Sequence, residues 1–454
     1  MKYRARRLAW ILLILLSSLP AWGQEEPARF LIERITVEGT KEAAANIVRS
    51  ETLLRAGESY SEGQLRQAVY RVHRLPFVLD ASFSLRKGSR RGAYELVIEV
   101  RPARWFFYDL WFRGFAFDQP LDLEGNEAFR GYRSSASVGS VAGVRRFVGR
   151  SGVLFAALDG EEGIQAGFTQ YDLLHRGILA SVGVSRNVCC VTEVLPLALD
   201  PTFSAWTFDT SLKVSLGISI PLSGPQSFQI TASERRGERG SRNEVLVGPG
   251  LRENPRSGGG EELSYRRAEA KWVWDTSDDP LFPTRGLSVS AGLEASRFAA
   301  RDLDLTQNPL ALEPIVFFYP TYRSEQVVGA VSVIRHWALT PRQTVSLMGR
   351  VSAGRSRLDD LAVKDRVLSH VNAEYYAGSA GIEHAWTLRR SRVAGELSDL
   401  RLESGVEIGG ERTHPDLGPS PLKRLSAHTG FVYRNPWGRI RLTFTYLDFR
   451  EVVR

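Results

Sequence analysis

Side chains that could do chemistry are few and scattered in this 454-residue sequence. The seven histidines lie apart from one another, and neither a His-Glu-x-x-His pair nor a Gly-x-Ser-x-Gly turn is present. His384 and His414 lie near acidic residues, but neither has a second histidine at the spacing of a metal site. The sequence therefore predicts that the protein is not an enzyme and holds no cofactor.

Three acidic residues lie close together at Asp275, Asp278 and Asp279. Their carboxylates could bind a hard cation such as Ca²⁺, which prefers oxygen ligands. Pro280 and Pro283 follow directly, however, and acids beside a proline turn usually cap and solvate that turn. The sequence favours this structural role, so we predict no metal site.

The residues around this turn alternate with a period of two. From Gly286 to Ser296, apolar residues alternate with small or polar ones, and the segment Arg439–Tyr446 repeats the pattern with two arginines on its polar face. Strict alternation predicts β-strands. Such strands fit a soluble, secreted sandwich with its apolar face inward, or a transmembrane barrel with its apolar face on lipid.

The N-terminal residues 1–23 have the features of a secretory signal peptide. A basic start precedes the apolar run Leu8–Leu16, and Ala21-Trp22-Gly23 forms a cleavage site before Gln24. An uncleaved anchor helix is the alternative, but the run is shorter than the roughly 20 residues that a spanning helix needs. No later apolar run approaches that length, so membrane residence would require a barrel.

The composition is compatible with a barrel. The chain contains 41 Gly, 22 Phe, 14 Tyr and 10 Trp but 2 Met, which suits many strands and turns. Residues 103–454 are long enough for between about 12 and 16 strands at roughly 10 residues each plus connections. The net charge of +8 includes four cations of the signal region, so it gives no support for nucleic-acid binding. Cys189 and Cys190 are adjacent, which provides no disulfide framework, although a vicinal or intermolecular bond stays open.

A small domain is expected before the barrel, at residues 30–102. An alternating strand ends at Gly39, a helix follows over Lys41–Arg55, and Ser61 is a suitable N-cap for a second helix. Two further strands, Leu75–Leu85 and Tyr94–Val100, are joined by a polar, glycine-containing turn. The predicted order is strand, helix, helix, strand, strand.

This order resembles a POTRA domain, the periplasmic module of the BamA/TamA-like outer-membrane assembly superfamily. Three motifs carry the likeness: Ile35-x-Val37-x-Gly39, Ala56-Gly57-x-x-Tyr60 and Leu96-x-Ile98-x-Val100. The barrels of that superfamily, also called bacterial surface antigens, have a proline signature at a strand junction. Here it is matched by Asp275, Pro280, Pro283, Thr284 and Gly286.

The resemblance implies a mainly β protein, with one POTRA-like domain in the periplasm and an antiparallel transmembrane barrel of about 16 strands in the outer membrane of a Gram-negative type cell. It also implies a mechanical function: the small domain captures unfolded outer-membrane or secreted client proteins by strand addition, and the barrel helps their insertion or translocation. Outer-membrane lipids and periplasmic accessory proteins are the other partners implied. Leu96, Val97 and Ile98 are the candidate client-binding edge.

The chain also departs from the superfamily pattern. Its members carry a Val/Ile/Leu-Arg-Gly-Phe/Tyr tetrad on an outer loop that folds into the lumen, where the arginine pairs with acids. The corresponding positions here are Ile382, Glu383, His384 and Ala385, so an acid replaces the arginine. With one POTRA-like domain and an altered tetrad, the chain resembles a divergent, single-POTRA member. An alternative function therefore stays open: a passive pore or structural barrel that has lost client handling.

Overall fold

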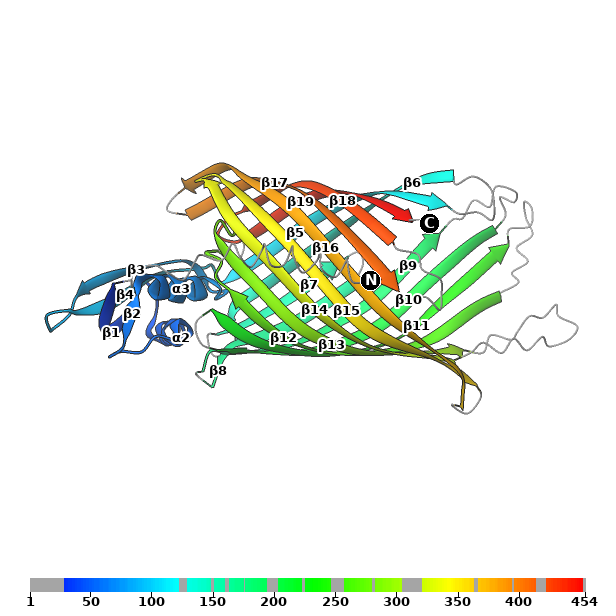
Figure 1. The fold of residues 1–454 in the computed structure, drawn as a ribbon, viewed down its shortest axis with the longest axis horizontal. Helices are drawn as coiled ribbons and strands as arrows, with labels where there is room; N and C mark the ends of the chain where they lie inside the picture. Colours follow the sequence, from blue (N-terminus) through cyan, green and yellow to red (C-terminus); the bar gives the residue numbers. More distant parts are fainter. Residues whose placement is uncertain are drawn as a thin grey trace, which may run out of the picture.

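The computed structural model shows a small α+β domain at one end of a large closed β-barrel (Figure 1). It describes residues 28–121, 129–147, 151–159, 163–174, 176–193, 203–222, 225–245, 257–279, 282–303, 321–362, 366–393, 396–413 and 422–451. The predicted signal peptide, residues 1–23, lies outside the described residues.

The small domain is a four-stranded sheet with two helices. Its elements are β1 (Arg29–Glu38), α2 (Glu42–Thr52), β2 (Ser59–Ser61), α3 (Glu62–His73), β3 (Val78–Lys87) and β4 (Ala93–Pro102). The strand order is β2-β1-β4-β3, with β1 and β4 parallel and the other neighbours antiparallel. The predicted order of elements is present, with the short strand β2 as an addition.

Local sequence explains how the helices form. Ser61 caps α3 through a reciprocal box, in which its hydroxyl accepts the Gln64 N–H while the Gln64 side chain accepts the Ser61 N–H. The apolar stripe of α3, including Leu65 and Val72, then packs on the sheet against Leu96 and other buried residues. This core holds the domain together.

One expectation about this sheet is wrong. Leu96, Val97 and Ile98 lie in β4, which pairs with β1 on one side and β3 on the other. All three are buried, with exposed fractions of 1%, 0% and 0%. An interior strand has no free backbone groups to offer an incoming strand. The sheet edges are β2 and β3.

The barrel has fifteen strands among the described residues, close to the expected number of about 16. Because the number is odd, the closing pair, β19 with β5, is parallel, whereas every other neighbouring pair is antiparallel. The strands are β5 (Phe106–Leu121), β6 (Phe129–Phe147), β7 (Gly152–Asp159), β8 (Gly163–Leu173), β9 (Ile178–Glu193), β10 (Phe203–Pro221), β11 (Gln226–Val245), β12 (Ser257–Asp275), β13 (Gly286–Leu303), β14 (Thr321–Thr340), β15 (Gln343–Ala362), β16 (Arg366–Val393), β17 (Glu396–Thr413), β18 (Leu422–Arg434) and β19 (Gly438–Glu451).

The outer wall of the barrel is apolar, which decides between the two sheet folds left open by the sequence. On β19, Ile440, Leu442 and Phe444 point outward with exposed fractions of 42%, 36% and 49%, while Arg439 and Arg441 line the inside. Exposed apolar bands on closed barrels are typical of membrane proteins. Neither helix in the described part of the chain is long and apolar enough to cross a membrane. The closed barrel and its apolar outer wall confirm the predicted fold class, a transmembrane barrel.

An ion pair in the small domain lies close to the barrel. Arg71 on α3 donates to the Glu51 carboxylate at 3.1 Å and to the Glu51 carbonyl at 3.0 Å, and the two side chains are 7% and 17% exposed. Burial raises the pKa of the Glu51 carboxyl from its ordinary 4.5 to about 7, against the opposing attraction of Arg71. Between about pH 4.5 and pH 7, the folded domain therefore keeps a proton on Glu51 that the unfolded chain releases.

We predict that the small domain loses stability as the pH rises through about 7. Protonation of Glu51 contributes fully below its ordinary pKa of 4.5 and is lost above its folded value of about 7, a change of at most about 3 kcal/mol. The urea midpoint of the far-ultraviolet helix signal, which α2 and α3 supply in the described chain, should fall between about pH 5 and pH 8. Glu51→Gln should flatten this dependence; an equally steep dependence in the variant would contradict the assignment.

Candidate functional site

The proline-containing turn between β12 and β13 is shaped by its three acids. Asp275 Oδ1 accepts the Ser277 N–H at 2.9 Å, and Asp278 Oδ1 accepts the N–H groups of Thr284 and Arg285 at 2.8 and 3.1 Å. These carboxylates accept hydrogen bonds from backbone N–H groups that have no partner strand in the turn. The sequence reading of the acids as turn caps is thereby supported by their contacts.

Gly286 ends the turn in a conformation that other residues rarely adopt, with φ of 122°. A Cβ added there would lie 2.6 Å from the Ser277 Cα, so a larger residue would not fit. The signature residues Asp275, Thr284 and Gly286 therefore specify the path of the turn. Pro283 lies in the described part of the turn, whereas Pro280 lies outside the described residues.

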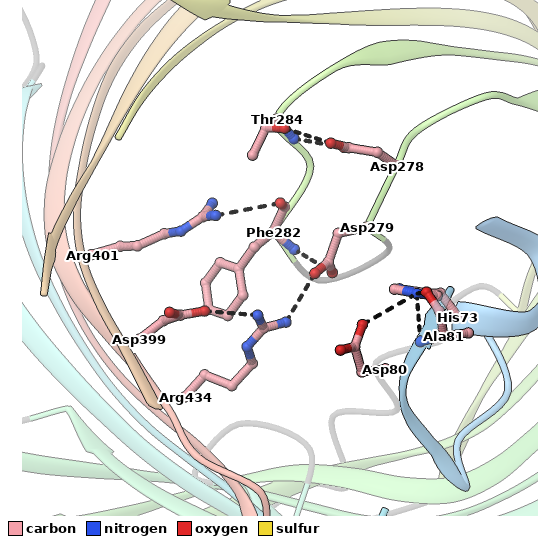
Figure 2. Close-up of polar contacts among 10 residues, drawn as sticks. All are labelled: His73, Asp80, Ala81, Asp278, Asp279, Phe282, Thr284, Asp399, Arg401 and Arg434. Atoms are coloured by element: carbon pink, nitrogen blue, oxygen red, sulfur yellow. Dashed lines mark hydrogen bonds and ion pairs between the residues drawn. The ribbon is translucent and has the colours of Figure 1, made fainter. Parts of the chain in front are cut away.

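The turn folds into the barrel and contacts the part of the wall formed by β17 and β18 (Figure 2). Phe282 is 2% exposed, and its ring lies 4.3 Å from the guanidinium carbons of both Arg401 on β17 and Arg434 on β18. The main-chain oxygen of Phe282 also accepts from Arg401 at 3.4 Å. Because β17 is four strands beyond β13 in the barrel, the turn spans part of the lumen at the end next to the small domain.

Acidic residues complete the contact between the turn and the wall. Arg434 donates to Asp279 of the turn at 3.0 Å and to Asp399 of β17 at 2.8 Å, as Figure 2 shows. Asp399 is 1% exposed, so its charge requires such a partner. Cation–π contacts to Phe282 stabilise the same arginine from the other side. We call Asp279, Phe282, Asp399, Arg401 and Arg434 the lumenal latch.

Beyond the latch, the lumen holds a polar cavity of about 200 Å³. Glu383 and Glu403 line it together with Arg439 and Arg441, and Glu383 lies 3.6 Å from His428 Nε2. Charged residues of both signs are therefore gathered on the wall formed by β16–β19. This mixture fits a water-filled lumen next to a plugged end.

The same wall is tied across the closing pair of strands. Asp109 on β5 accepts from Arg439 on β19 at 2.5 Å and from Arg441 at 3.4 Å. The Tyr108 hydroxyl accepts from the Asn435 amide at 2.8 Å. The β19–β5 seam therefore has side-chain contacts in addition to its ladder at the end next to the small domain.

The small domain is joined to the turn and to the neighbouring barrel rim. Arg74, at the C-terminal end of α3, donates to the Asp275 carbonyl at 2.9 Å and lies 3.2 Å from its carboxylate. Ser50 of α2 donates to Asp172 near the end of β8 at 3.1 Å, and Tyr171 packs against the small-domain core. The latch-bearing turn is thus in direct contact with the small domain at its first residue.

The other residues that the sequence singled out in the barrel region lie within strands. Ile382, Glu383, His384 and Ala385 lie within β16 and not in a loop folded into the lumen, so that expectation is wrong. Glu383 does face the lumen, while Ile382 points outward with 53% exposure. Cys189 and Cys190 lie in β9, paired with Asp209 and Phe208 of β10.

The sequence pattern did not single out Asp399, Arg401 and Arg434, the wall half of the latch. No motif marks these three residues, which lie in strands with ordinary alternation. Charges at alternating positions of β17 could have indicated a lumen-facing row, but their partner Phe282 lies more than 100 residues earlier. Only the order of the strands in the barrel brings the turn and these wall residues together.

Comparison with known proteins finds structural likeness alone. No protein-family model and no curated protein matches the chain. BamA from Haemophilus ducreyi lacking POTRA domains 1-3 is 11% identical, with a TM-score of 0.40 over 94% of this chain and 81% of that one. CdiB from Escherichia coli is 13% identical, with a TM-score of 0.44 over 89% and 70%.

The N-terminal domain of Omp85 from Thermosynechococcus elongatus is 19% identical over 22% of this chain and 37% of that one, with a TM-score of 0.17. All three TM-scores lie below 0.5, so these likenesses carry no conclusion about function.

We predict that Asp109→Asn weakens the closure of the barrel. The substitution removes the charge that Arg439 and Arg441 share across the parallel seam. The temperature at which the folded band is lost on semi-native gel electrophoresis should fall by several degrees. Glu294→Gln is the matched control, because it breaks a lumen-facing ion pair with Arg267 at an antiparallel junction away from the seam. An equal fall in both variants would contradict a special role of the seam.

Proposed function

We propose that this chain is an outer-membrane barrel that assists the insertion or translocation of client proteins. The small domain captures an unfolded client by strand addition on the periplasmic side, and the barrel receives it. The work is mechanical and not catalytic. The observation that carries the proposal is a free strand edge on a domain that is itself joined to the turn plugging the lumen.

The free edge is the outer side of β3. Gly88 N–H bonds to the Ala93 carbonyl at 2.9 Å, which fixes the alternation of the β3–β4 ladder. The backbone groups of Phe83, Leu85 and Lys87 therefore point away from β4, and no described strand pairs with them. An extended client could bond to these groups without any particular sequence.

The start of this edge is covered by a histidine. The Ala81 N–H donates to His73 Nε2 at 2.8 Å, and Asp80 lies 3.6 Å from the same nitrogen (Figure 2). The imidazole satisfies the backbone group that would otherwise continue the open edge toward the barrel. The available edge is thus short, which limits unwanted pairing between copies of the protein.

The proposal places the small domain in the periplasm and the barrel in the outer membrane. The connections next to the small domain are short, for example the residues between Thr340 and Gln343, as is typical of periplasmic turns. Clients are unfolded outer-membrane or secreted proteins, with membrane lipids around the barrel. The alternative function is a passive pore or structural barrel. It is favoured by the ion pairs that hold the latch and the β19–β5 seam closed.

We predict that Lys87→Pro impairs client capture while the barrel stays folded. Proline removes an outward N–H and places its ring where an incoming strand would lie, so photo-crosslinks from a probe at the exposed Ser84 to an unfolded barrel client should fall about five- to tenfold. Lys87→Ala is the matched control, since it removes the same side chain but keeps the N–H. Equal crosslinking by both variants, with the helix signal intact, would favour the passive barrel.

A further inference from the structure

A row of charged residues crosses strands β11 to β14 on the outer wall of the barrel, and Arg357 on β15, opposite Glu325, continues it. Glu234 on β11, Arg266 on β12, Arg297 on β13 and Glu325 on β14 are direct cross-strand partners. Their side chains are 40%, 59%, 42% and 54% exposed. They share the outward face with apolar neighbours such as Leu293. We call these four residues the charged row.

The centre of the charged row is electrostatically unusual. Each arginine has an acid on its outer side, with Arg266 lying 3.2 Å from Glu234 and Arg297 lying 3.8 Å from Glu325. On their inner sides the two arginines face each other across the β12–β13 ladder. Like charges directly opposite each other destabilise a sheet. The middle of the row therefore fits an anionic group.

A shallow groove lies directly beside the charged row. The next outward row is built from small residues flanked by larger apolar ones: Leu216, Ala232, Ala268, Ala295 and Val327. The three alanines leave a hollow of about 600 Å³, which the arginines and acids border on one side. An apolar floor with a charged border fits a molecule that has a hydrocarbon part and a charged head.

The position of the row along the barrel matches a membrane boundary. Exposed aromatic residues mark the other boundary, with Trp105 at 61%, Trp386 at 43% and Trp437 at 38% exposure near the small domain. On β13, Leu287 begins the apolar face and Arg297 ends it. That stretch of about 10 residues, at roughly 3.3 Å per residue and a tilt of about 40°, spans roughly 25 Å, the height of a barrel's lipid-facing band.

We propose that the charged row and the alanine groove form a binding site for an anionic, phosphate-bearing lipid of the membrane leaflet far from the small domain. The phosphate lies between Arg266 and Arg297 and relieves their repulsion, while an acyl chain lies along Ala232, Ala268 and Ala295. A lipid is the occupant because the groove is part of the wall that faces the membrane. The site rests on membrane residence and not on client handling.

Titration of the full chain in neutral detergent, followed by native mass spectrometry, tests the site. Dioleoylphosphatidylglycerol should bind at least tenfold more tightly than dioleoylphosphatidylcholine, and the double variant Arg266→Gln/Arg297→Gln should lose that preference. Arg355→Gln is the matched control, because Arg355 is an outward arginine of neighbouring β15, 85% exposed and 3.7 Å from Glu374, with no arginine opposite it. The control should keep the preference.

Ala268→Leu separates the lipid from a free anion. The larger side chain fills the groove and leaves both arginines in place, so it should weaken phosphatidylglycerol binding without affecting the weak competition by inorganic phosphate. Equal affinity for the two lipids, an unchanged preference in the double variant, or competition by inorganic phosphate as strong as by the lipid would each overturn the proposal. Client crosslinking at Ser84 should be the same in all these variants, so a failure of the site is distinguishable from a failure of the proposed function.

Discussion

The contact of Phe282 with Arg401 and Arg434 is the interaction on which the organisation of this lumen depends. Two arginines in one enclosed wall repel each other and lose solvation, so they need a compensating environment. The turn supplies it with an aromatic face and the Asp279 carboxylate, and Asp399 supplies a second buried acid. The turn also depends on the wall formed by β17 and β18, because Phe282 would otherwise expose its ring to a polar lumen. Neither half is stable in this arrangement without the other.

The latch continues into the seam and into the small domain. Arg434 ends β18, and the following residue Asn435 bonds to Tyr108 on β5, next to the Asp109 that holds Arg439. At the other end of the turn, Asp275 is bonded to Arg74. Both arginines of the latch are on the wall, and the inserted turn carries the acid Asp279.

Much of the fold could be predicted because it follows from local chemistry. Alternation gave the strands, Ser61 marked the start of α3, and the two arginines of β19 identified the lumen face. Sheet order could not be predicted in the same way. Val97 is buried because β4 pairs with β1, although two helices and two strands lie between them in the sequence. The same limit applied to the latch and to the charged row, whose members meet only through barrel register. The segment around Glu383 is a strand and not a loop, because it pairs on both sides with β15 and β17.

The most direct test of this account is the single-channel conductance of the refolded mature chain in planar bilayers, measured for Phe282→Ala, Arg74→Ala and the double variant. If the turn closes the lumen and the small domain holds the turn, each single change should raise the conductance or the open time, and the double variant should add little to Phe282→Ala. This follows because both substitutions release the same turn. Conductance that is unchanged by Phe282→Ala would contradict a closing role of the latch. Fully additive effects would contradict its connection to the small domain.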